Sequence, residues 1–248
     1  MLLSVGVWTT SISLAWAAAA PVFDDYAEAY RAASSESKML LVAVACDVDF
    51  EKLDSRRLDQ FVLCRIDKDA TIESEGRGVK LVEHPSFADL GGSGVAVVDF
   101  VNDDFRGEVV SVLPRRHASP AHVQALLDLP AGSLTQRTLI WALRVHPERP
   151  MSVHGVAAPE LMAHARNHSR VQASTNRQHH NLPVGIASSE IVAESWPWNR
   201  NVVDAAIDIV DSWRQSSGHW SAARRRWSYY GYDMKHNGSK WFATGVFR

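Results

Sequence analysis

The sequence predicts a protein of mixed α/β and α+β class that is built in two parts. Helix-like and strand-like hydrophobic patterns alternate over the first half of the chain, as in an α/β layer sandwich. A turn-rich stretch, residues 129–133, then interrupts the pattern, and the second half carries three amphipathic helices and a closing strand. The length of 248 residues allows two domains, which we expect to span residues 24–128 and 134–248.

Each element of the first half follows from a local pattern. Asp24 and Asp25 are placed to cap a helix, and Ser119-Pro120 is a typical helix start. An unbroken apolar run is typical of a strand that is buried on both faces. In order, the expected elements are a helix over 24–37, a strand over 39–46, a short charged helix over 50–60, a strand over 61–67, a hairpin with strands 94–100 and 107–113, and a helix over 119–128.

The second half has equally local signals. A helix over 134–145 ends at a proline-containing segment, because proline disfavours the helical conformation in the residue before it. Pro159 begins the next helix, and Asn201 caps a third helix over 202–214. The closing residues, 240–248, are expected to form a strand.

Charge and the N-terminal residues bear on partners and location. The formal net charge is −2, so we expect no nucleic-acid partner. Residues 1–20 are apolar and end in an Ala-rich run, the pattern that signal peptidase recognises, but no Lys or Arg precedes Arg31. We expect a signal peptide over 1–20 and a secreted or periplasmic mature chain with no stable membrane span. An uncleaved anchor or an apolar tail is the alternative.

Histidines give the second half its candidate chemistry. The chain has 11 of them, and His164 and His168 stand at the i, i+4 spacing that can chelate a metal from one helix face. No glutamate of the His-Glu-x-x-His type accompanies this pair, so a packing role is favoured for it. His180 and His219, with Glu194 between them, offer two imidazoles and a carboxylate, which are good zinc ligands.

The order of five motifs in the second half resembles the CAP superfamily, the cysteine-rich secretory and pathogenesis-related group that is also called the SCP domain. Over roughly residues 135–248, these motifs are His168-Ser169, the later His180, Ala193-Glu194-Ser195 in place of Gly-Glu-Asn, Ser217-Gly218-His219, and the closing Trp241-Phe242-Ala243-Thr244-Gly245-Val246-Phe247. The resemblance implies an α-β-α sandwich with a cavity formed by His180, Glu194 and His219. Trp196 and Trp220 are candidates for the rim of that cavity, or else for core packing.

A metal in this cavity would be zinc or another divalent ion. Many members of the family have a second acidic residue after the tryptophan of the third helix, whereas this chain has Arg214-Gln215 after Trp213. With three protein ligands, a metal would keep an open position. The alternative is a hydrogen-bonded core network that binds nothing.

The element order of residues 24–128 is similar to a thioredoxin-like fold, without the chemistry of that family. Disulfide exchange needs a Cys-x-x-Cys motif after the first buried strand, because the helix N-terminus lowers the pKa of the thiol. Here the stretch is Cys46-Asp47-Val48-Asp49, and the two aspartates would raise the thiol pKa. We therefore expect a redox-inactive domain in which Cys64 is a small buried hydrophobe. A disulfide between Cys46 and Cys64 is disfavoured, because neighbouring strands rarely offer its geometry.

Together the two resemblances imply an exported binding or interaction protein rather than an enzyme. Its expected partner is a small hydrophobic or lipid-like ligand, or a component of the cell envelope. The alternative is a metal-assisted hydrolase in which the same residues hold a cation that activates water, with Glu194 as ligand or as general base.

Overall fold

The computed structural model describes residues 21–74, 76–195 and 201–248, so the expected signal peptide over residues 1–20 lies outside the described part of the chain. The structure is mixed α/β with several sheets, which confirms the expected class at that level. The first half contains β1 (Val22–Phe23), α1 (Tyr26–Glu36), β2 (Met39–Val44), α2 (Ser55–Leu58), β3 (Phe61–Ile66), β4 (Thr71–Ser74), β5 (Arg77–Lys80), β6 (Gly94–Val98), β7 (Val109–Pro114) and α3 (Pro120–Leu127). The second half contains α4 (Leu134–Val145), β8 (Val156–Ala157), α5 (Pro159–Thr175), β9 (Ser189–Ser195), α6 (Val202–Gln215), α7 (Ser217–Arg224), β10 (Tyr229–His236) and β11 (Trp241–Phe247).

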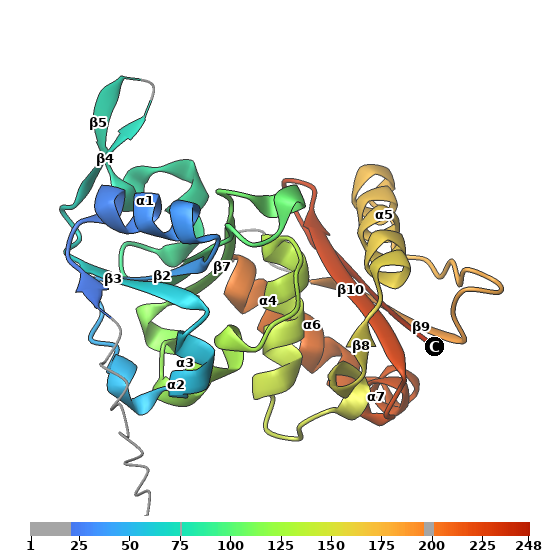
Figure 1. The fold of residues 1–248 in the computed structure, drawn as a ribbon. Helices are drawn as coiled ribbons and strands as arrows, with labels where there is room; N and C mark the ends of the chain where they lie inside the picture. The colour runs from blue at the N-terminus through green and yellow to red at the C-terminus, as the bar shows by residue number, and fades with distance from the viewer. Residues whose placement is uncertain (1–20, 75, 196–200) are drawn as a thin grey trace, which may run out of the picture.

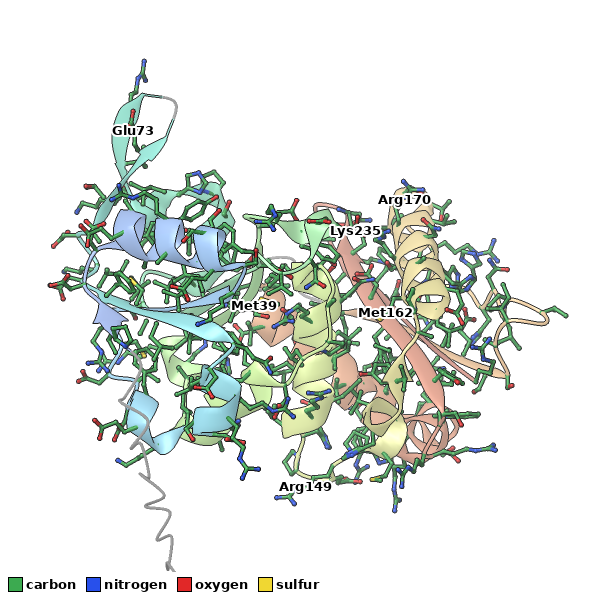
Figure 2. The ribbon with its side chains drawn as sticks, viewed as in Figure 1. Met39, Glu73, Arg149, Met162, Arg170 and Lys235 are labelled. Atoms are coloured by element: carbon green, nitrogen blue, oxygen red, sulfur yellow. The ribbon has the colours of Figure 1, made fainter. Side chains whose placement is uncertain are left out.

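A five-stranded sheet organises the first half, in the order β1-β3-β2-β6-β7. The strands β1, β3 and β2 are parallel neighbours, β6 is antiparallel to β2, and β7 is antiparallel to β6. In the centre of the sheet, Val42 pairs with Cys64 on one side and with Ala96 on the other. Helix α1 covers one face and α3 lies at the other (Figure 1). Figure 2 shows Glu73 on the β4–β5 hairpin, which projects away from this sheet.

A four-stranded sheet organises the second half, in the order β8-β10-β11-β9. Strand β11 is antiparallel to both of its neighbours, β10 and β9, and β8 is parallel to β10. Helix α5 covers one face, whereas α4, α6 and α7 lie at the other (Figure 1). Figure 2 shows Met162 and Arg170 on α5 and Lys235 on β10. Because β9 is an edge strand, the segment 176–188 connects the end of α5 directly to one edge of the sheet.

Helix α5 approaches this sheet closely at Gly231 in β10. A Cβ atom at that position would lie 2.2 Å from the carbonyl carbon of Leu161 and 2.6 Å from the backbone nitrogen of Met162. Further along α5, Ser169 Oγ donates a hydrogen bond to the buried carboxyl group of Asp233, which is also in β10. These two contacts fix which face of α5 meets the sheet, and therefore where its histidines point.

Helices α4 and α6 lie between the two sheets (Figure 1), and buried apolar side chains form one continuous cluster through both halves. Arg137 on α4 is 1% exposed, and its guanidinium donates hydrogen bonds to Ser111 Oγ in β7 and to the carbonyl oxygens of Leu129 and Pro130. The turn-rich stretch 129–133 is therefore held by buried hydrogen bonds.

Most of the expected helices and strands are observed with small changes at their ends. Asp25, Ser119 and Asn201 cap α1, α3 and α6 through their side chains. The helix expected over 50–60 is broken into a 3₁₀ turn, Phe50–Lys52, and the single turn of α2. The sequence did not predict β8, β9 or β10 as strands. In β10, Gly231 and Asp233 interrupt the usual strand pattern, because Gly231 allows the close approach of α5 and Asp233 accepts a hydrogen bond from Ser169.

Candidate metal site

Helix α5 presents two histidines beside the edge strand of the second sheet. His164 and His168 lie one helical turn apart, and their ring centroids are 5.9 Å apart. The His168 side chain is buried, and that of His164 is mostly buried. On the inner side of the same helix, His168 Nδ1 also lies 3.4 Å from the hydroxyl oxygen of Thr244 in β11. The pair therefore faces the sheet rather than solvent.

Glu190 in β9 provides the carboxylate of this site, and only 2% of its side chain is exposed. Its Oε1 atom lies 2.9 Å from His168 Nδ1 and 3.9 Å from His164 Nε2. Its Oε2 atom lies 3.0 Å from His180 Nδ1 and accepts a hydrogen bond of 2.8 Å from the backbone N–H of Asn181. One buried carboxylate thus joins α5, the loop that follows it, and β9.

Burial and the neighbouring groups set the charges in this cluster. Burial raises the pKa of Glu190, but hydrogen bonds from His168, the Asn181 N–H and His180 outweigh it and hold that pKa below its usual value. For His164, burial is the largest effect and lowers the pKa of the imidazole despite the nearby carboxylate. At neutral pH Glu190 is therefore an anion and His164 is neutral, which are the states that metal ligation requires.

Two imidazole nitrogens of the cluster, His164 Nε2 and His168 Nε2, are buried without a hydrogen-bond partner among the described residues. Such atoms are rare, because leaving a buried polar group unpaired costs about 1–3 kcal/mol. One ligand atom from each of His164, His168 and Glu190 can be chosen so that all lie within 4.8 Å of one another. Imidazole nitrogen and carboxylate oxygen are ligands that zinc accepts. The donor set therefore fits a divalent cation.

The structure brings together two of the three cavity residues that the sequence suggested. The ring centroids of His180 and His219 are 5.8 Å apart, with an interplanar angle of 43°. Burial lowers the pKa of His219, and the charge of His180 lowers it further. Glu194 lies four residues from Glu190 along β9, and its Oε2 atom is 3.4 Å from Lys240 Nζ. It is Glu190 whose carboxylate contacts His180.

Of the two tryptophans expected at a cavity rim, the described part of the chain contains only Trp220, and its contacts do not form such a rim. Trp220 in α7 is buried, and its indole N–H donates a hydrogen bond of 2.9 Å to Glu148 Oε2. Its ring packs edge-on against His146 at a centroid distance of 4.9 Å. Trp196 lies outside the described residues. The observed contacts of Trp220 are those of a packed helix.

Sequence reasoning missed Glu190, although one signal points to it. Glu190 and Glu194 stand on either side of Val192 with the strand period of two, so both side chains leave the same face of β9. Recognising 189–195 as a strand would have made both carboxylates candidates. The pair His164 and His168 had the chelating spacing, but its acidic partner comes from this separate strand.

The two cysteines of the first half are free and show no sign of activation. Burial raises the pKa of the Cys64 thiol to about 12. Burial also raises the pKa of the Cys46 thiol, and Asp47 adds to this effect while Arg115 opposes it. Because the thiolate is the reactive form, neither cysteine is prepared for nucleophilic or redox chemistry at neutral pH.

No protein-family model matches this chain, and no curated protein or solved structure is significantly similar to it. Over the described ranges of the chain, no helix has both the length and the apolar character needed to cross a membrane. The function must therefore be inferred from the cluster around Glu190.

Proposed function

We propose that this protein binds a divalent metal ion through His164, His168 and Glu190. The observation that carries the proposal is that donor atoms of all three residues lie within 4.8 Å of one another, with His164 Nε2 and His168 Nε2 buried and without a hydrogen-bond partner among the described residues. Zinc takes such nitrogen and oxygen ligands at about 2.0–2.2 Å, and three protein ligands leave a fourth position open for another ligand. The low pKa of Glu190 and of His164 favours the deprotonated donors that the cation would need.

The proposal includes the architecture inferred from the sequence. The order helix, strand, helix, strand, hairpin, helix that suggested a thioredoxin-like unit is present as α1, β2, α2, β3, β6–β7 and α3. A sheet with α5 on one face and α4, α6 and α7 at the other supports the interpretation of the second half as a CAP-like sandwich (Figure 1). We accordingly propose a redox-inactive thioredoxin-like unit followed by a CAP-like unit.

A binding role is favoured over hydrolysis at this site. Hydrolysis assisted by a metal needs a group beside the cation that accepts a proton from water. Glu190 is used as a ligand in this proposal, and Glu194 lies beside Lys240 instead. We therefore propose an exported protein that acts by binding, with a small hydrophobic ligand or a cell-envelope component as its partner.

A zinc-dependent thermal shift tests the metal site. At a hundredfold excess over its dissociation constant, zinc would stabilise the folded chain by about 2.7 kcal/mol. For a chain of this size, such a gain raises Tm by roughly 5–11 °C. His164→Ala and Glu190→Gln are expected to remove the shift. His154→Ala, which removes an exposed histidine outside the cluster, is expected to keep it.

Two results would contradict this assignment. If zinc, cobalt and manganese all leave the Tm of the wild-type protein unchanged, the cluster is a hydrogen-bonded core and not a metal site. If His219→Ala abolishes the zinc shift while His164→Ala retains it, the cation is bound on the His180 side of Glu190.

A further inference from the structure

The first half of the chain contains a cavity that the proposed metal site does not use. It has a volume of about 440 Å³ and lies between α1, the β4–β5 hairpin, the segment 84–87 and the start of β7. Figure 1 shows α1 and the hairpin at the opposite end of the molecule from α5. The wall of the cavity is mostly apolar, and its principal residues are Tyr26, Tyr30, Arg31, Ile72, His84 and Phe87. Cavities of about 300–1,000 Å³ with mostly apolar walls and a few polar groups are typical of small-ligand sites.

Aromatic rings form much of this wall, and their packing holds them in place. Tyr26 and Tyr30 lie one turn apart on α1, with ring centroids 5.9 Å apart. The Tyr26 ring meets Phe87 edge-on at 6.0 Å, and the Tyr30 ring meets the buried Phe100 edge-on at 4.7 Å. Gly107 has a φ of 79°, and a Cβ atom there would lie 2.9 Å from the Tyr30 hydroxyl oxygen, so the turn before β7 approaches Tyr30 this closely because Gly107 has no side chain. Rings that are already fixed lose little entropy when a planar ligand packs against them.

The polar groups of the wall are mainly hydrogen-bond donors. The hydroxyl groups of Tyr26 and Tyr30 have no hydrogen-bond partner among the described residues. Burial is the largest of the effects that raise the pKa of Tyr26, so its hydroxyl group is protonated at neutral pH. His84 Nδ1 accepts the Ser86 N–H at 3.3 Å, so the proton of the neutral imidazole is on Nε2. Among the described residues that line the cavity, Glu73 on the hairpin is the one carboxylate (Figure 2). A ligand that accepts hydrogen bonds therefore finds more partners here than a ligand that donates them.

Arg31 adds a positive charge to these donors. Its Nε atom donates a hydrogen bond of 3.1 Å to the carbonyl oxygen of Ala27, one turn earlier in α1. Its two terminal nitrogen atoms have no ion-pair partner among the described residues. A planar guanidinium recognises a carboxylate through two parallel hydrogen bonds, and this geometry adds specificity as well as energy.

We infer that this cavity binds a small aromatic carboxylate, whose ring packs against Tyr26 and Phe87 and whose carboxylate group is bound by Arg31. The ring replaces water at the apolar wall, and the carboxylate oxygens accept hydrogen bonds from the guanidinium and from the tyrosine hydroxyl groups. The inference does not depend on the proposed metal site, because the two sites share no residue.

Binding of 2-naphthoate to the full-length protein, measured by calorimetry with a chelator in the buffer, tests this inference. We expect a single binding site per chain, with the neutral 2-naphthamide bound at least about tenfold more weakly because the amide lacks the charge that Arg31 recognises. Arg31→Gln should weaken 2-naphthoate binding about tenfold or more and leave 2-naphthamide binding nearly unchanged. Tyr30→Phe, which removes only a hydroxyl group, should weaken 2-naphthoate binding by a smaller factor. Arg56→Gln is the matched control, because it removes an exposed arginine on α2 that does not line the cavity, and it should bind both compounds like the wild type.

Several results would overturn the inference. Absence of 2-naphthoate binding at millimolar concentration would show that the cavity does not accept this class of ligand. Unchanged binding in Arg31→Gln, or equal losses in Arg31→Gln and Arg56→Gln, would show that no specific carboxylate site exists at Arg31. Tighter binding of 2-naphthylmethylamine than of 2-naphthoate, abolished by Glu73→Gln, would show that the cavity selects cations. Because Arg31 and Glu73 are both exposed, their variants should fold, which circular dichroism checks.

Discussion

Replacing Arg137 by Met tests how strongly the two halves of the chain depend on each other. The guanidinium of Arg137 donates hydrogen bonds of 2.8 Å to Ser111 Oγ, 3.2 Å to the Leu129 carbonyl and 2.8 Å to the Pro130 carbonyl. These partners belong to β7 and to the turn-rich stretch before α4. Burial lowers the pKa of Arg137 to about 10, so the side chain is still charged at neutral pH. A buried cation is therefore held by neutral oxygens from the first half and the connecting stretch.

The expected loss follows from these contacts. Met keeps most of the apolar stem of the arginine side chain. Ser111 Oγ and the two carbonyl oxygens lose their hydrogen-bond donor, and each buried group left unpaired lowers the free energy of unfolding by about 1–3 kcal/mol. Removing the charge offsets part of this loss, because the folded chain no longer has to desolvate a guanidinium. We expect the free energy of unfolding of Arg137→Met to fall by about 3 kcal/mol. The loss for Arg137→Lys should be smaller, because lysine keeps the charge but lacks the planar guanidinium with its several fixed donors.

Urea denaturation followed by fluorescence and by circular dichroism measures this loss. The wild type and both variants should each unfold in one transition, because the apolar cluster runs through both halves. If Arg137→Met has the same urea midpoint and slope as the wild type, the buried hydrogen bonds contribute no net stability and the reasoning fails. Two separate transitions in the wild type would show that the halves unfold independently.

Two further variants test the contact between α5 and β10. Burial raises the pKa of Asp233 to about 6. Between about pH 4 and 6 the folded chain therefore binds a proton that the unfolded chain has released, and wild-type stability should fall by about 3 kcal/mol as pH rises through this range. Asp233→Asn should remove this slope in urea titrations at stepped pH, and parallel pH profiles would contradict the assignment. Gly231→Ala would place a Cβ 2.2 Å from the Leu161 backbone and should cost about 3 kcal/mol. Gly218→Ala meets nothing within 4 Å and should gain about 0.5–1 kcal/mol, so equal Tm values for the two alanine variants would argue against the close approach.

The sequence by itself determined the elements whose causes are local. Asp25, Ser119 and Asn201 each accept a backbone N–H from the first turn of the helix that they precede, so each cap could be predicted from residues three positions apart. The apolar run of β2 predicted a central strand, because both faces of such a strand are buried and its side chains are therefore apolar on both sides. The i, i+4 spacing of His164 and His168 likewise placed both on one helix face.

Only the tertiary structure decided which groups meet. Glu190 and Glu194 leave the same face of β9, and the sequence cannot rank them. The position of α5 on the sheet, set at Gly231 and Asp233, puts His164 and His168 beside Glu190. That position depends on packing and hydrogen bonds between segments far apart in the chain. A local pattern therefore identifies a donor on one face of a helix or strand, whereas helix packing and strand order decide which donors share a site.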